Sequence, residues 1–336
     1  MQLIRSLGSD GPSRNNGLMA GKRVALALGS GGARGYAHIG VINELQDRGY
    51  DIVGVAGSSM GALVGGLQAA GKVDEFTQWA ESLTQTAVLR LLDPSISAAG
   101  VLRAAKILDA VRDILGEVTI EELPIPYTSV ATDLISGKSV WLQRGPVDAA
   151  IRASIAIPGV ITPHVLDGRL LADGGILDPL PMAPIAAVAA DLTIAVSLGG
   201  SETAGGQEAD GESRATTEWL TRMWRSTTAL FDVNRAGSGS DSDSSDEELV
   251  DATKETTVPR LGSFEVMNRT IDIAQAALAR HTLAAYPPDL LIEVPRTACR
   301  SLEFHRAAEV IAIGRDLASQ ALDEYREKVS SDLSTG

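Results

Sequence analysis

Between residues 23 and 71 the sequence passes twice from a short apolar run, through a glycine-rich turn, into a segment with helical periodicity. The apolar runs are RVALAL (23–28) and DIVGVA (51–56), which have the length and composition of buried strands. The apolar residues that follow each turn recur at helical spacing: Tyr36, Ile39, Ile42 and Leu45, then Met60, Leu63, Val64 and Leu67. Strand, helix, strand and helix within about fifty residues predict a parallel βαβ unit.

The rest of the chain continues this alternation and predicts a three-layer α/β/α sandwich with a mainly parallel central sheet. Strands are expected at 127–134, 139–142, 164–166, 169–172, 191–198 and 287–294, and helices at 74–87, 102–115, 264–286 and 302–328. Two of these strands, 164–166 and 169–172, flank Asp167-Gly168, which has the chemistry of a hairpin turn.

Composition divides the chain into four parts. Residues 1–21 are expected to form a flexible arm, and they lack the apolar core of a signal peptide. Residues 22–200 form the predicted catalytic core, and 259–330 a helix, strand and helix that complete the same domain. Between them, 201–258 read as an acidic low-complexity insertion. Residues 202–251 hold 12 acidic and 4 basic residues, so more than half of the net charge of −14 lies there.

Three features exclude other classes of protein. The uncharged run 53–71 has Gly57, Gly61 and Gly65 at the spacing of a membrane helix dimer, but its six glycines, two serines and one glutamine argue against insertion. No basic stripe is present, so nucleic acid is not an expected partner. Cys299 is the single cysteine, which rules out an internal disulfide and fits a reducing, cytoplasmic compartment.

The segment GSSMG (57–61) fits a nucleophile elbow, in which a serine sits on a sharp turn between a strand and a helix. About 0.2 matches to Gly-x-Ser-x-Gly are expected by chance in such a chain, so the motif depends on its context. Here Ser59 ends one predicted strand and opens one predicted helix, while Gly57 and Gly61 leave room for the turn. The competing interpretation is a serine in a turn of small residues.

The loop GSGGARG (29–35) offers several backbone N–H groups at another helix N-terminus, where an oxyanion could be stabilised. Its glycines, Gly29 among them, also give a degenerate dinucleotide-binding spacing. That alternative needs an acidic residue at the end of the next strand, which instead ends VAGSS. For Arg34 we favour an ion pair that fixes the loop over a contact with an anionic headgroup.

The partner of the serine is the less obvious assignment. His38, His164, His281 and His305 are the four histidines, and none lies in the loop context that usually presents a catalytic histidine. Of two Asp-Gly pairs, Asp167-Gly168 is explained by its turn. Asp173 follows the strand RLLA and precedes Gly174 and Gly175, which would let another segment approach closely, so we favour Asp173.

Four motifs occur in order, GSGGARG, GSSMG, ASIAIPGVITP and LADGG, and together they resemble the patatin-like phospholipase family. The tail PPDLLIEVP to LEFHRAAEVIAIG further resembles small bacterial members related to the catalytic domain of neuropathy target esterase. The resemblance covers about residues 22–200 and 259–325. The sequence departs from the family at Asp178, a position where such proteins often carry Asn.

The resemblance implies a serine esterase that hydrolyses phospholipids or lysophospholipids through a Ser–Asp dyad without histidine. Ser59 would be the nucleophile, Asp173 would accept its proton, and the N–H groups of Gly31, Gly32 and Ala33 would form the oxyanion hole. Neither a metal nor another cofactor is expected, since no His or Cys spacing supports a site.

Three questions stay open at the level of sequence. An α/β-hydrolase triad of Ser59, Asp173 and His281 or His305 has the expected chain order. A regulatory or scaffolding protein could keep the same fold. Within the insertion, Trp219, Trp224 and Phe231 share one face of an amphipathic segment, 218–231, which would either contact a membrane peripherally or pack on a partner.

Overall fold

The computed structural model describes residues 21–91, 105–158, 160–200 and 263–335. The chain divides into two units, residues 1–203 with 272–336, and residues 204–271. Of the second unit the structure describes only 263–271, the first turns of helix α9 (Ser263–Ala285). The acidic insertion and the N-terminal arm predicted from the sequence lie outside the described residues.

Eight strands form one mixed sheet in the order β5-β6-β3-β2-β1-β7-β8, with β4 paired to β3. Their bounds are β1 Arg23–Leu28, β2 Asp51–Ser58, β3 Tyr127–Asp133, β4 Lys138–Leu142, β5 His164–Leu166, β6 Arg169–Asp173, β7 Leu192–Gly200 and β8 Leu290–Pro295. The pairs β1–β2, β1–β7, β2–β3 and β7–β8 are parallel. The pairs β3–β4, β3–β6 and β5–β6 are antiparallel, so the antiparallel part lies at one end of the sheet.

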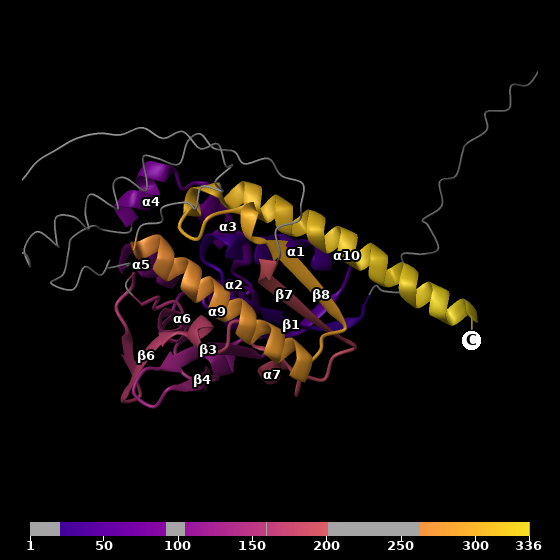
Figure 1. The fold of residues 1–336 in the computed structure, drawn as a ribbon, viewed down its shortest axis with the longest axis horizontal. Helices are drawn as coiled ribbons and strands as arrows, with labels where there is room; N and C mark the ends of the chain where they lie inside the picture. The colour runs from indigo at the N-terminus through magenta and orange to yellow at the C-terminus, as the bar shows by residue number, and fades with distance from the viewer. Residues whose placement is uncertain (1–20, 92–104, 159, 201–262, 336) are drawn as a thin grey trace, which may run out of the picture. The chain divides into compact units, whose positions relative to one another are not determined.

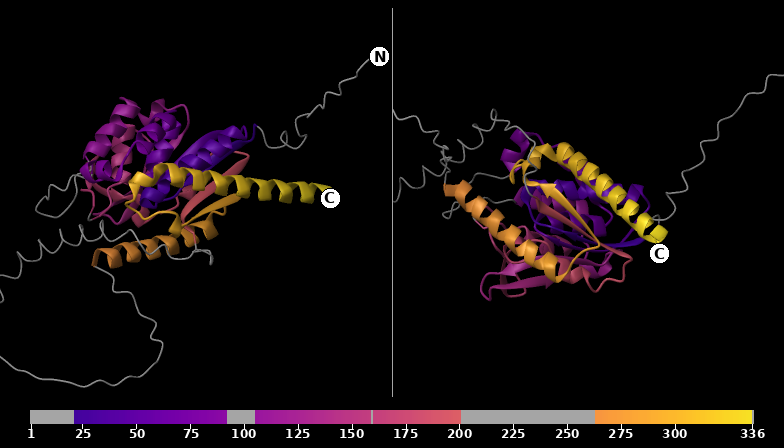
Figure 2. Two further views of the ribbon diagram at one scale, coloured as in Figure 1. Left: turned by 90° about the horizontal axis from the view of Figure 1, so that it is seen from above. Right: turned by 45° about the vertical axis from the view of Figure 1, so that its right-hand side comes forward.

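Helices cover both faces of this sheet (Figures 1 and 2). One layer contains α1 Ala37–Asp47, α2 Met60–Ala69, α3 Val73–Glu81, α5 Ala105–Leu115, α6 Val147–Ser154 and α10 Ala307–Thr335, with α4 Gln85–Leu91 beside α5. The other face is covered by the short helix α7 (Met182–Ile185) and by the part of α9 from Asp272 onward. The predicted three-layer sandwich with a mainly parallel sheet is confirmed.

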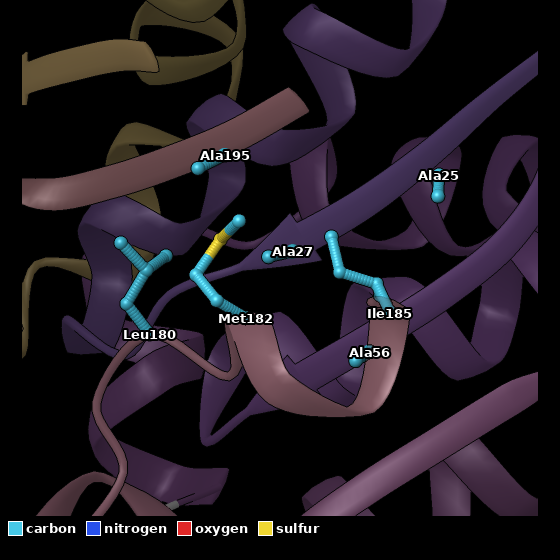
Figure 3. Packing of buried hydrophobic residues seen from close by; sticks show 7 residues of the cluster. All are labelled: Ala25, Ala27, Ala56, Leu180, Met182, Ile185 and Ala195. Carbon is cyan, nitrogen blue, oxygen red and sulfur yellow. The ribbon is translucent and has the colours of Figure 1, made fainter. Parts of the chain in front are cut away.

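Alternation along β1 explains how both faces become buried. Val24, Leu26 and Leu28 point to one face and Ala25 and Ala27 to the other, and all five side chains are inaccessible to solvent. On the alanine face, small side chains let α7 lie close against the strands. Figure 3 shows the cluster formed there by Ala25, Ala27, Ala56, Ala195, Leu180, Met182 and Ile185.

One predicted helix is wrong as a single element. The segment 74–87 is two helices, because α3 ends at Glu81 and α4 begins at Gln85. The Ser82 hydroxyl donates to the carbonyl of Trp79, and the Thr84 hydroxyl accepts from the N–H of Ala87. These local bonds end one helix and begin the next. No helix within the described ranges is long and apolar enough to span a bilayer.

Candidate active site

Ser59 lies on the sharp turn between β2 and α2, at the place where the sequence predicts an elbow. Its backbone has φ 56° and ψ −123°, a conformation that residues other than glycine seldom adopt. A side chain at Gly57 would collide with the carbonyl of Gly61, and one at Gly61 with the carbonyl of Leu28. The two glycines therefore allow the helix to start directly against the strand ends, and the strained residue is the serine itself.

The side chain of Ser59 meets that of Asp173. The Ser59 hydroxyl donates to Asp173 Oδ2 at 2.6 Å, and the two residues are only 3% and 4% exposed. Asp167, the rival carboxylate, lies in the exposed β5–β6 turn at φ 50°. The structure thus brings Ser59 and Asp173 together and leaves Asp167 in the hairpin.

Strand register explains how residues 114 positions apart come into contact. β2 pairs with the first part of β3, up to Ser58 opposite Val130. β6 pairs with the last part of β3, starting with Asp173 opposite Ala131, and it runs antiparallel. Because β4 occupies the other edge of β3, β2 and β6 share one edge and meet end to end. The residue after β2 and the last residue of β6 are therefore neighbours.

Burial determines the electrostatics of Asp173. Desolvation raises the pKa of its carboxyl to about 6, while the hydrogen bonds from Ser59 and from the N–H of Gly175 act in the opposite direction. The Gly175 N–H donates to Oδ1 at 2.7 Å, so each carboxylate oxygen has one donor. Asp178, five residues on, is partly buried, and desolvation also raises its pKa to about 6.

The glycine loop is held by backbone bonds on both sides. The N–H of Gly29 donates to the carbonyl of Val196 at 3.0 Å, and the N–H of Ala33 donates to the carbonyl of Ser301 at 2.9 Å. Of the three predicted oxyanion-hole donors, Ala33 is therefore already engaged. For Gly31 and Gly32, the described residues contain no acceptor bonded to their N–H groups.

His38 holds the glycine loop through a hydrogen bond to Gly29. The sequence did not indicate this role. The Nε2 of His38 lies 2.8 Å from the carbonyl of Gly29 and must carry the hydrogen, because a carbonyl only accepts. The ring is fully buried, which lowers its pKa to about 4 and keeps it neutral.

Within the described residues, Arg34, His281 and His305 make no hydrogen bond to Ser59 or Asp173. The Arg34 guanidinium pairs with Asp272 at 3.3 Å, and its side chain is 6% exposed, consistent with the loop-fixing role. His281 is exposed on α9, and His305 lies in a 3₁₀ turn (Phe304–Arg306) before α10. The Asp173 carboxylate is bonded to Ser59 and Gly175, and neither histidine is among its partners.

A pocket opens beside Ser59 and Gly32 on the α2 side of the sheet. Its cavity volume is about 60 Å³, so the pocket is a narrow one. Its wall is almost entirely apolar and includes Leu63, Trp79, Ile107, Ile157, Val160 and Phe304. Across the described part of the chain, no three His, Cys, Asp or Glu side chains gather as metal ligands would.

Comparison with known proteins identifies relatives of this chain. Residues 26–186 match the family model of patatin-like phospholipases. An NTE family protein of Mycobacterium tuberculosis is 68% identical over 333 residues, covering 90% of this chain and 92% of the relative. Neuropathy target esterase sws of Drosophila melanogaster is 30% identical over 191 residues, covering 55% of this chain and 13% of that protein.

Among solved structures, VipD from Legionella pneumophila matches with a TM-score of 0.43 and 17% identity, covering 91% of this chain and 67% of that one. The match to nearly the full length of an NTE family protein, together with the patatin-like segment, confirms the resemblance seen in the motifs. The chain belongs to the NTE family of patatin-like phospholipases.

Proposed function

We propose that the protein is a serine esterase that hydrolyses acyl esters of lipids, of the phospholipid or lysophospholipid type. The observation that carries this proposal is the 2.6 Å hydrogen bond from Ser59 to a buried carboxylate at the edge of an apolar pocket. Membership of a family with esterase and phospholipase names supports the same class of reaction.

In the first half-reaction, Ser59 Oγ attacks the ester carbonyl while Asp173 takes its proton. The oxyanion that forms would accept hydrogen bonds from the N–H groups of Gly31 and Gly32, near the positive end of α2. As the tetrahedral intermediate collapses, protonated Asp173 gives its proton to the leaving alcohol. The products are an acyl-Ser59 ester and the free alcohol.

In the second half-reaction, Asp173 accepts a proton from water, and the resulting hydroxide attacks the acyl-Ser59 carbonyl. Collapse releases the fatty acid and returns the proton to Ser59. A carboxylate with a pKa near 6 is a stronger base than an ordinary aspartate, so burial of Asp173 supports its role in both steps. No metal or cofactor is needed in this scheme.

The apolar wall of the pocket favours an acyl chain as its occupant, because few polar groups line it. We propose a cytoplasmic enzyme that reaches its lipid peripherally through Trp219, Trp224 and Phe231, which lie outside the described residues. Deleting 218–231 should reduce co-sedimentation with liposomes while hydrolysis of a soluble ester continues. Unchanged sedimentation would remove this segment as the anchor.

Labelling with a fluorophosphonate probe, followed by mass-spectrometric mapping, tests the proposal directly. An adduct on Ser59 is expected, because the hydroxyl is activated by Asp173. Folded protein that takes up no probe would favour the non-catalytic, scaffolding alternative.

Replacing His281 and His305 by Gln, singly and together, tests the triad alternative. Full hydrolysis of a soluble ester by all three variants is expected from the dyad, since neither histidine is hydrogen-bonded to Asp173. A loss of about 10³-fold or more in any of the three would require a triad.

A further inference from the structure

Ser154, the last residue of α6, contacts the backbone of the nucleophile. Its hydroxyl oxygen accepts a hydrogen bond from the N–H of Ser59 at 2.9 Å and donates one to the carbonyl of Val130 at 2.5 Å. The side chain is inaccessible to solvent. Ser154 therefore links the turn after β2 to the middle of β3.

The position of this bridge follows from the sheet register. Ser58 is the last residue of β2 paired with β3, opposite Val130, and Ser59 then turns away at φ 56°. Because of this turn, the Ser59 N–H does not continue the β2–β3 hydrogen bonding. From the next residue of β3, Ala131, the paired strand is β6. The Ser154 hydroxyl occupies the gap between donor and acceptor. Without it, a buried N–H and a buried C=O would lose their partner.

The residues that follow Ser154 hold the other half of the site. The carbonyl of Ala156 accepts the N–H of Asp173 at 2.9 Å. Ile155 and Ile157, on either side, line the apolar pocket. One short segment thus fixes the backbones of both Ser59 and Asp173, on which the 2.6 Å separation of their side chains depends.

We propose that Ser154 is a positioning residue for the nucleophile. By satisfying the displaced N–H of Ser59, it stabilises the strained elbow and keeps the Ser59 hydroxyl within reach of Asp173. Ser154 does not touch the substrate in this role. The inference rests on the proposed function, because it concerns the reactivity of Ser59.

The test compares Ser154→Ala with a matched control, Ser129→Ala. Ser129, on β3, is also fully buried, and its hydroxyl donates to the carbonyl of Ala150 on α6 at 3.0 Å, but it makes no hydrogen bond to Ser59. Ser154→Ala should lower kcat on a soluble ester, and the rate of fluorophosphonate labelling, by about 10–100-fold. KM should change by less than about threefold, because the pocket is intact. Ser129→Ala should stay within about threefold of the wild type in both measurements.

The pH dependence of kcat provides a second measurement. It would not change if Ser154 had a purely structural role. If the Ser59–Asp173 bond loosens, the pKa of Asp173 rises, since that bond lowers it. The midpoint of the Ser154→Ala profile should therefore shift upward, while that of Ser129→Ala stays in place. Ser154→Cys, which keeps the shape but bonds more weakly, should fall between the wild type and Ser154→Ala.

Each outcome has one meaning. Equal losses in Ser154→Ala and Ser129→Ala, or wild-type labelling of Ser154→Ala, would overturn the positioning role while leaving the esterase intact. Failure of both Ser154 variants to fold would also overturn it, because the serine would then serve the fold rather than the nucleophile. A wild-type protein that neither labels nor hydrolyses esters would instead remove the proposed function.

Discussion

At the scale of single residues, the site depends on a carboxylate buried beside a serine. Asp173 is held by two donors, and its position next to Ser59 follows from the meeting of two strand ends. Asp167 has the same following glycine but lies in an exposed turn. The two aspartates therefore form a natural pair for comparison.

Asp173→Asn should lower kcat on a soluble ester by about 10³-fold or more, because an amide cannot accept the serine proton. Asp167→Asn should retain nearly full activity, since Asn tolerates the left-handed turn. Steady-state kinetics on both variants provide the measurement. Equal losses would mean that the two Asp-Gly pairs have been assigned to the wrong roles.

The pH dependence of activity should report the same carboxyl. Only ionised Asp173 can act as the base, and desolvation raises its pKa to about 6. We expect kcat/KM to rise with pH through about 6 and to level off above 7. A profile already flat between pH 4.5 and 8 would contradict a base with this pKa.

The free energy of unfolding should change with pH in the opposite direction, falling where kcat/KM rises. The folded protein holds the Asp173 proton up to about pH 6, whereas the unfolded chain releases it near pH 4. The stability contributed by this group is therefore present below about pH 4 and is lost as pH rises through 6. Asp173→Asn should raise the free energy of unfolding by about 1–3 kcal/mol at pH 8 and by less at pH 4. Urea titrations at both pH values measure the difference, and an equal gain at both would contradict it.

At the scale of elements, the glycine loop fits under a segment from the far end of the chain. Gly32 has φ 58°, and a side chain there would collide with the carbonyl of Ser301. The same carbonyl accepts the N–H of Ala33, so displacing it would distort the predicted oxyanion hole.

Gly32→Ala should therefore lower kcat by at least about 10²-fold, comparable with the loss of an oxyanion donor. The control is Gly137→Ala in the β3–β4 turn, which has φ 64° but nothing within 4 Å of the added carbon. Both variants carry the same left-handed strain, of about 1 kcal/mol. Similar activities of the two would show that the Gly32 contact does not affect catalysis.

The apolar pocket is also assembled from several elements, and filling it should change acyl selectivity. Ile157→Trp would occupy space beside Ser59. We expect kcat/KM on long-chain p-nitrophenyl esters to fall by about tenfold or more relative to the acetyl ester. Ile135→Trp, at a position 81% exposed and outside the pocket, serves as the control. An unchanged chain-length profile for Ile157→Trp would mean that the acyl chain binds elsewhere.

At the scale of the whole first unit, its first and last helices pack closely enough to exclude side chains. A side chain at Gly314 of α10 would collide with the carbonyl of Ala37 on α1, and one at Gly40 of α1 with the carbonyl of Ile311. Residues more than 270 positions apart in sequence thus share one interface, which covers the face of the sheet that carries the pocket.

Gly314→Ala should lower the free energy of unfolding by about 1–3 kcal/mol, because overpacking forces the two helices apart. Helix propensity alone predicts the opposite sign, a gain of about 1 kcal/mol. Ser330→Ala, at an exposed position of the same helix, should be nearly neutral. Thermal and urea unfolding measure both variants, and a stabilised Gly314→Ala would show that the interface can open without cost.

Several features of this protein were determined by local sequence. Runs such as RVALAL and DIVGVA specify strands, and the glycines around Ser59 specify a sharp turn, because apolar periodicity and backbone freedom act over a few residues. The same locality explains the error at 74–87, where periodicity continued across Ser82 and Thr84 although their side chains end one helix and begin the next. The motif order was enough to indicate the family.

Tertiary structure decided what no local pattern encodes. The meeting of β2 and β6 on one edge of β3 places Asp173 beside Ser59, and it depends on register between strands more than a hundred residues apart. The engagement of Ala33 by Ser301, the support of Gly29 by His38 and the bridge made by Ser154 follow from the same packing. Such contacts are determined only when the whole sheet is assembled, because each joins groups whose distance is set by the fold rather than by the chain between them.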